Sequence, residues 1–235
     1  TKEMLPLITQ RQKDISLQLN ICMLTFLRET TKYSYLVQSW KKELYNFFLS
    51  DTFFVTQTEK TLSIWTELID QLMVSDKSMQ NDFLKYATKL LQQTHFSLND
   101  TNVSRLKGLR LLGLVLFGGQ VDQYDRQLAS ILDNLLEVMK QSNDDSLICC
   151  AFLCLRVIYQ RFSLSSLLNE YWATVLMEII SALTRNGRVM TPKVEYYSTK
   201  LVETLGSVPE LNFHTYYLFM FIIFFFLLFI HLFIH

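Results

Sequence analysis

The 235-residue sequence predicts an all-α protein, in which antiparallel helix pairs stack as a HEAT/armadillo-like α-solenoid and a hydrophobic helix follows at the C-terminus. Three observations lead to this fold class. Apolar residues recur every three to four positions almost without interruption, which is the period of an amphipathic helix. The chain holds only 6 Gly and 3 Pro, too few for the frequent turns of an all-β protein. Hydrophobic residues make up 50% of the chain, enough to bury a full core in one or two domains.

The first half of the predicted solenoid covers residues 1–94. Its helices are expected at residues 10–28, 35–49, 60–74 and 76–93. In each helix one apolar stripe is predicted to face the core. These stripes consist of Ile15, Leu19, Met23 and Phe26 or Leu27; of Leu36, Trp40, Leu44, Phe47 and Phe48; of Leu62, Trp65, Leu68, Ile69 and Leu72; and of Phe83, Leu84, Ala87 and Leu91.

The second half of the same domain is predicted at residues 103–206, after a polar loop at 95–102. Its helices are expected at residues 103–117, 122–141, 145–162, 165–184 and 193–205. The breaks between most of them are short, which makes neighbouring helices antiparallel. Two helix pairs are offset by about forty residues, the spacing of HEAT or armadillo repeats. An ordinary, non-repetitive helical domain stays open as the alternative, because no residue-level repeat signature is visible.

The last twenty residues, 216–235, carry no formal charge and no Gly or Pro. A helix of this length reaches about 30 Å, the thickness of the hydrocarbon core of a bilayer, and its Phe, Ile and Leu residues outweigh the single interior His231. The run therefore predicts a transmembrane helix that leaves residues 1–215 on the cytosolic side as a tail-anchored protein. The abrupt change in composition favours another interpretation equally, namely translation past a true exon end. Both stay open.

The charge balance and the cysteines point to an intracellular protein without a metal site. Lys and Arg number 22, as do Asp and Glu, so no global field attracts nucleic acid. The chain begins at Thr1 without a secretory signal, as expected for a fragment or an incomplete gene model. Cys149, Cys150 and Cys154 lie on one apolar stretch without a paired Cys-x-x-Cys module. We expect buried, reduced thiols of a cytosolic protein.

The sequence contains no recognisable catalytic or cofactor-binding motif, and we predict no catalytic, cofactor-binding or metal-ligating residue. All four histidines, at positions 95, 214, 231 and 235, fall outside the predicted helical core. No Gly-x-Ser-x-Gly pattern marks a nucleophile. Gly118 and Gly119 follow a helix and lack the Lys-Ser/Thr ending of a phosphate loop. An enzyme is therefore not expected.

Charged residues are predicted to have structural roles. Two carboxylate pairs, Asp122 with Asp125 and Asp144 with Asp145, stand at predicted helix starts, where negative charge stabilises exposed amides. Three cations, Arg105, Lys107 and Arg110, point around more than half of one helix and are expected to form an ordinary solvated face. A further cation, Arg156, lies inside an apolar stretch and is expected to extend to solvent or to pair with an acid across the stack.

Several stretches, in the same order and at similar separations, resemble the C-terminal region of the Dopey family. They are WKKEL at 40–44, FFL at 47–49, DTFF at 51–54, Leu62, Trp65, ID at 69–70, LM at 72–73, DKS at 76–78, DQY at 122–124, AFLCLRV at 151–157 and Trp172. The similarity extends weakly through Lys200, Leu201, Pro209, Phe213 and Tyr216 or Tyr217. At the Phe-rich run the chain departs from the family pattern, since members of this family look like peripheral membrane proteins without a span.

The resemblance implies a non-catalytic scaffold or adaptor in Golgi–endosome membrane trafficking and protein transport. It also implies two kinds of protein partner, a large Arf-exchange-factor-like helical scaffold and aminophospholipid flippases, and a location on the cytosolic face of Golgi and endosomal membranes. Membrane contact would be peripheral or through residues 216–235. The matching residues are structural signatures, and none carries over as a catalytic or ligand site. The alternatives are an integral tail-anchored protein with an unrelated helical body and a helical-repeat module of another pathway, such as nuclear transport.

Overall fold

The structure is a computed structural model, and it describes residues 16–48, 50, 53, 58–75, 77–94, 97–163, 166–184 and 191–206. Within these ranges every regular element is a helix, which confirms the predicted all-α class. The α-helices are α2 (Leu17–Thr30), α3 (Ser34–Phe48), α5 (Glu59–Ser75), α6 (Lys77–Gln92), α7 (Leu98–Gly118), α8 (Leu128–Gln141), α9 (Asp145–Arg161), α10 (Ser166–Thr184) and α11 (Pro192–Gly206). A short 3-10 helix, η2 (Asp125–Gln127), precedes α8.

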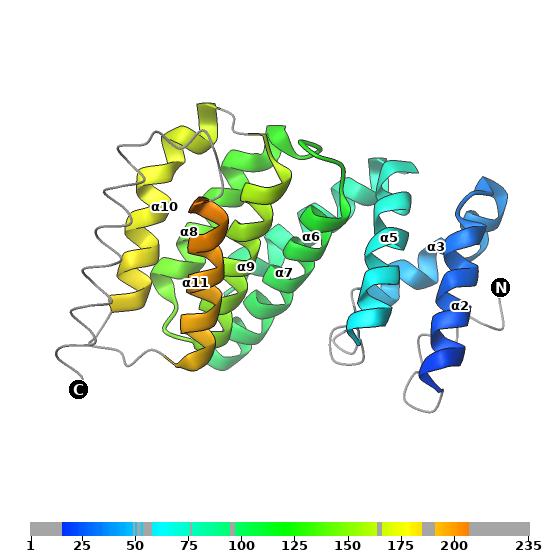
Figure 1. Ribbon diagram of the computed structural model, residues 1–235, viewed down its shortest axis with the longest axis horizontal. Coiled ribbons are helices and arrows are strands. Elements are labelled where there is room, and N and C mark those ends of the chain that lie inside the picture. The colour runs from blue at the N-terminus through cyan, green and yellow to red at the C-terminus, as the bar shows by residue number, and fades with distance from the viewer. Residues whose placement is uncertain are drawn as a thin grey trace.

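The helices follow one another along the long axis of the molecule in two rows (Figure 1). In the first row α2 packs on α5, α5 on α7, α7 on α9 and α9 on α11. In the second row α6 packs on α8 and α8 on α10. The rows contact each other where α6 meets α7 and where α8 meets α9. From α5 to α9, each helix therefore packs on the helix two places further along the chain.

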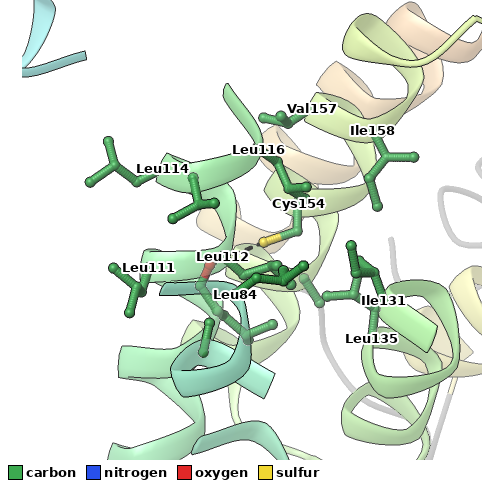
Figure 2. Close-up of a cluster of buried hydrophobic side chains, with 14 of the residues drawn as sticks. Leu84, Leu111, Leu112, Leu114, Leu116, Ile131, Leu135, Cys154, Val157 and Ile158 are labelled. Atoms are coloured by element: carbon green, nitrogen blue, oxygen red, sulfur yellow. Dashed lines mark hydrogen bonds between the residues drawn. The ribbon is translucent and has the colours of Figure 1, made fainter. Parts of the chain in front are cut away.

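A continuous hydrophobic core runs between the rows. At the N-terminal end it is aromatic, where rings from α3, α5 and α6 and the ring of Phe53 contact one another mostly edge to face. Both Trp40 and Trp65 are fully buried there, as predicted. Further along, α6, α7, α8 and α9 supply aliphatic side chains that surround Cys154 (Figure 2). The Cys154 thiol donates a hydrogen bond of 3.2 Å to the Leu109 carbonyl.

The first helix, α2, buries a face that agrees only in part with the predicted stripe. Met23 is buried as predicted, and of the alternatives Phe26 and Leu27 it is Leu27 that is fully buried, while Phe26 is 48% exposed. Leu19, expected in the core, is 52% exposed, and Leu24 is fully buried instead. The buried stripe also takes in Asn20 and Thr30. Residues 20–27 are apolar on most sides, so spacing alone did not select the face that meets α5. The predicted N-terminal part of this helix, residues 10–15, lies outside the described residues.

The predicted polar loop at residues 95–102 is wrong in its second part, because α7 begins at Leu98. Asp100 stands in the first turn, where its charge suits the positive end of the helix dipole. Thr101 is buried, and its hydroxyl donates to the Ser97 carbonyl at 3.1 Å. Tertiary burial thus extends the helix into a polar stretch of weak helix formers.

The predicted helix 122–141 begins later than expected, since α8 starts at Leu128. Asp122 has a φ of 61° and does not cap that helix. Its carboxylate accepts hydrogen bonds from the backbone N–H of Ser163 at 2.6 Å and from the Ser163 hydroxyl at 2.7 Å. Its own N–H donates to the Arg161 carbonyl at 3.1 Å. The turn is therefore tied to the end of α9, far away in the sequence.

The second carboxylate pair behaves as predicted, because Asp144 is the N-cap residue of α9. One of its oxygens accepts from the backbone N–H groups of Ser146 at 2.7 Å and Leu147 at 3.3 Å. Such side-chain bonds satisfy amides that have no partner within the helix.

The hydrophobic helix predicted at residues 216–235 lies outside the described residues and stays a prediction. Among the helices that the structure describes, none combines the length and apolarity needed to cross a bilayer. The division of the body into halves at 1–94 and 103–206 also stays a prediction, although α6 and α7, one from each half, pack directly on each other.

Candidate functional site

A groove of about 510 Å³ opens on the first row of helices. Four successive members of that row, α5, α7, α9 and α11, contribute side chains to its lining. The volume falls within the range of about 300–1,000 Å³ that is typical of ligand-binding clefts.

The groove is apolar along much of its length. Leu62 from α5, Phe117 from α7 and Leu153 from α9 line it and are 38%, 47% and 39% exposed. Leu109 and Val157 lie beneath them as buried lining. Leu62 was predicted in the core, and its exposure corrects that prediction. Helix α5 turns Trp65 inward to the core and Leu62 outward to the groove. Large apolar side chains exposed side by side mark an interaction surface more often than scattered ones do.

The charged side chains of the lining are all cationic. Arg110 comes from α7, Arg156 from α9 and Lys193 from α11, and no acidic side chain is found among the described lining residues. Arg156 donates through Nε to the Thr204 hydroxyl on α11 at 3.0 Å, so the partner that the structure gives it is a hydroxyl and not the acid considered in the sequence analysis. Arg110 is exposed. The surface is thus positive and apolar together.

Two of the three cations, Arg110 and Lys193, lie toward one end of the groove, whereas Arg156 lies further along α9 beside Thr204 of α11. Cys154 contacts the Leu109 carbonyl and Arg161 contacts the Gly119 carbonyl, so α7 and α9 run parallel. Arg110 precedes Phe117 by about two turns of α7 and lies beside Cys150, near the start of α9, whereas Phe117 lies at the C-terminal end of α7. Lys193 is in the first turn of α11 and belongs to the same end as Arg110.

Cys150 marks this cationic end. Burial raises the pKa of the Cys150 thiol, while the nearby charges of Arg110 and Lys193 oppose the shift. Burial likewise raises the pKa of Cys149 and of Cys154. The predicted burial is confirmed for Cys149 and Cys154, and Cys150 is half-buried. At neutral pH these thiols stay protonated, which does not suit nucleophiles or metal ligands.

The expected solvated face of Arg105, Lys107 and Arg110 is wrong for Arg105, which is only 7% exposed. Its Nε donates to the Leu91 carbonyl at 3.3 Å and its Nη2 to the Gln141 side-chain oxygen at 2.6 Å. The Leu91 carbonyl belongs to the last turn of α6, where carbonyls lack partners within the helix. Arg105 thus joins the ends of α6 and α8 to α7.

A second polar cluster lies at the C-terminal ends of α7 and α9, away from Arg110 and Lys193. Burial raises the pKa of Asp70 on α5, and the neighbouring Arg161 opposes that shift. Burial, and next the Asp70 charge, raise the pKa of Tyr124. Arg161 also donates to the Gly119 carbonyl. The cluster holds the connection after α7 against α5 and α9, which is a structural role.

The remaining candidates for chemistry offer no reaction centre in the part of the chain that the structure covers. No group of three or more His, Cys, Asp or Glu side chains there could hold a metal ion. The four histidines named in the sequence analysis all lie outside the described residues.

A protein-family model described as DOP1 C-terminal matches residues 4–203. Protein pad-1 of Caenorhabditis elegans is 29% identical over 163 residues, which are 68% of this chain and 7% of that protein. Protein DOP1B of Xenopus laevis is 23% identical over 186 residues, 79% of this chain and 8% of that protein. Protein DOP1B of Mus musculus is 26% identical over 154 residues, 66% of this chain and 6% of that protein. The chain thus spans a small part of these relatives. No solved structure matches it significantly.

Proposed function

The chain belongs to the Dopey family, because the DOP1 C-terminal model matches residues 4–203, and we propose on this basis that it is a non-catalytic scaffold. Its place of action would be membrane trafficking between the Golgi and endosomes. Family membership supports a trafficking-related scaffold in general terms. One structural observation carries the proposal, namely the groove across α5, α7, α9 and α11. Its lining combines exposed apolar side chains with cations, which suits the binding of another macromolecule.

The architecture behind this function is a HEAT/armadillo-like α-solenoid. Contact between every second helix, in two rows, is the packing expected of stacked helix pairs, in which each pair buries the apolar face of the next. Stacks of this kind present extended surfaces to partners, as a scaffold requires.

The partners in this proposal are a large Arf-exchange-factor-like helical scaffold and aminophospholipid flippases. The complex would act on the cytosolic face of Golgi and endosomal membranes. Support for these partners comes from the resemblance of the chain to its family.

Proximity labelling tests the proposal. The full chain, fused to a biotin ligase and expressed in cells, should enrich Golgi and endosomal proteins of both partner classes over a ligase that carries an unrelated helical solenoid. Enrichment of nuclear-transport proteins, or of no trafficking protein above that control, would contradict it. A reproducible turnover of any substrate by the purified chain would contradict the non-catalytic part.

An integral tail-anchored protein is the second candidate, and the charge-free run at residues 216–235 favours it. Carbonate extraction of membranes that hold the full chain, beside a version ending at residue 215, separates the two. Resistance that depends on the last twenty residues supports the span, whereas release of both versions supports a peripheral scaffold.

A further inference from the structure

We infer that the groove across α5, α7, α9 and α11 binds an acidic, amphipathic segment of a partner protein. Apolar side chains of that segment would enter the groove, and its Asp or Glu residues would pair with Arg110 and Lys193. The inference rests on the proposed scaffold function and specifies its docking site and the chemistry of its partner.

The apolar part of the argument concerns the exposed lining. Leu62, Phe117 and Leu153 come from three neighbouring helices and form one strip of the groove. A helix that presents Leu or Phe at every third or fourth position matches such a strip, because residues at that spacing share one face. Covering the strip removes apolar surface of both partners from water.

The charge part of the argument concerns the cationic end. Arg110 and Lys193 line the groove together with Cys150, and both charges lower the pKa of its thiol against the effect of burial, so both cations face the same stretch of the groove. The structure gives neither of them a salt bridge within the ranges it describes, while surface pairs such as Lys200 with Glu203 do form elsewhere. Two cations beside an apolar floor favour carboxylates at one end of the bound segment and disfavour Lys or Arg there.

The shape of the surface favours a protein segment over a membrane. The apolar residues lie within a recess that also takes in buried side chains of α7 and α9. A flat bilayer surface is instead bound by apolar or basic side chains that project outward, as on interfacial helices. Binding to anionic lipid is therefore an outcome that the experiment must separate.

The experiment starts from a library of displayed random peptides, selected on the full chain. Enriched peptides should carry Leu, Ile or Phe at helical spacing next to Asp or Glu. A synthetic copy, labelled with a fluorophore, is then titrated by fluorescence anisotropy. Arg110→Glu and Leu153→Asp should each weaken binding about tenfold or more, since losses of about 1.4 kcal/mol are ordinary for groups at the centre of an interface.

Matched controls lie away from the groove. Arg126 on η2 and Met177 on α10 are exposed, as Arg110 and Leu153 are, so Arg126→Glu and Met177→Asp should change affinity by less than about twofold. A peptide with Lys in place of each Asp and Glu should bind at least about tenfold more weakly. Circular dichroism checks that every variant keeps its helical content.

Three outcomes would overturn the inference. The enriched peptides could lack an excess of Asp and Glu, or they could bind the Arg110→Glu and Leu153→Asp variants as tightly as the original chain. In the third outcome, phosphatidylserine vesicles bind in a way that depends on Arg110 while no peptide binds. Failure here differs from failure of the proposed function. If the Arg110→Glu chain still labels Golgi and endosomal proteins in cells, the scaffold stands and only its groove lacks this role.

Discussion

At the scale of single residues, the buried Arg105 shows how one side chain can hold three helices. Its guanidinium group reaches the Leu91 carbonyl at the end of α6 and the side chain of Gln141 at the end of α8. A cation at the C-terminal end of a helix also meets the negative end of the helix dipole. Its neighbours in the sequence, Ser104 and Leu106, do not indicate this buried position, because the fold brings the partners to Arg105.

We expect Arg105→Ala to lower the free energy of unfolding by about 2–3 kcal/mol, because charge-assisted hydrogen bonds are lost and a buried carbonyl is left unpaired. Urea denaturation followed by circular dichroism measures the change. Arg126→Ala, at an exposed position on η2, should change the same quantity by less than about 0.5 kcal/mol. Equal effects of the two substitutions would show that Arg105 contributes no more than a surface arginine.

The raised pKa of Asp70 has a consequence for the pH dependence of stability. A carboxyl that binds its proton more tightly when folded stabilises the protein while it is protonated. That contribution is lost as the pH rises from the ordinary Asp pKa through the raised folded one. The Asp70→Asn variant lacks this titration. Its free energy of unfolding, relative to the original chain, should therefore increase between about pH 3 and pH 7.

Urea unfolding at several pH values measures that difference for Asp70→Asn. Asp125→Asn, at an exposed site on η2, provides the control and should give a nearly constant difference. A difference that decreases with rising pH would mean that attraction to Arg161 outweighs the burial of Asp70.

At the scale of elements, α7 occupies the centre of the packing, with contacts to α5, α6 and α9. Two of its glycines differ in the space around them. A Cβ added at Gly108 would lie 3.0 Å from the Leu90 Cβ and 3.1 Å from the Ala87 carbonyl oxygen, both fixed to the backbone of α6. A Cβ added at Gly113 would meet only the Cys154 sulfur, at 3.4 Å.

The same substitution should therefore have opposite effects at these two positions. Replacement of Gly by Ala inside a helix contributes about 1 kcal/mol of stability where space allows. Gly113→Ala should keep or raise the melting temperature, whereas Gly108→Ala should force α6 and α7 apart and lower it by several degrees. Differential scanning calorimetry compares the two variants. A higher melting temperature for Gly108→Ala would mean that α6 moves aside at no cost.

Much of the element order could be predicted from hydrophobic spacing alone. Several boundaries agree to within a residue or two, as for α3, α5, α9 and α10. The errors have tertiary causes. The turn at Asp122 depends on hydrogen bonds to Ser163, and the first turn of α7 depends on the burial of Thr101. The face of α2 depends on its contact with α5.

At the scale of the whole molecule, the groove could not be predicted, because no local motif marks it. Leu62, Arg110, Leu153 and Lys193 lie far apart in the sequence and meet only through the register of four helices. Leu62 belongs to a stripe that otherwise enters the core, so its pattern indicated burial. Short connections between long helices predict that every second helix packs side by side. They do not predict that Leu62, Phe117 and Leu153 stay exposed in the groove.

The row arrangement also predicts where the molecule opens first. Among the described helices, α5, α7 and α9 have same-row neighbours on both sides, while α2 and α11 stand at the ends of the first row. The helices α7 and α9 also pack on α6 and α8 of the second row, respectively, whereas α2 contacts mainly α5. Hydrogen exchange of the full chain, followed by mass spectrometry, should show the slowest amide exchange in α7 and α9 and the fastest in α2. Uniform protection would instead indicate that the whole stack opens as one cooperative unit.

The uneven distribution of charge along the groove also determines the direction in which a bound segment lies. Arg110 and Lys193 lie near one end and Phe117 lies near the other, while the third cation of the lining, Arg156, already donates to the Thr204 hydroxyl. A ligand that carries its carboxylates on one half and its bulky hydrocarbon on the other has a single favourable way to lie there. Turning it head to tail would set hydrocarbon against the guanidinium and ammonium groups. The groove therefore fixes the chain direction of a bound segment, and with it the side of the helix stack on which the rest of the partner protein lies.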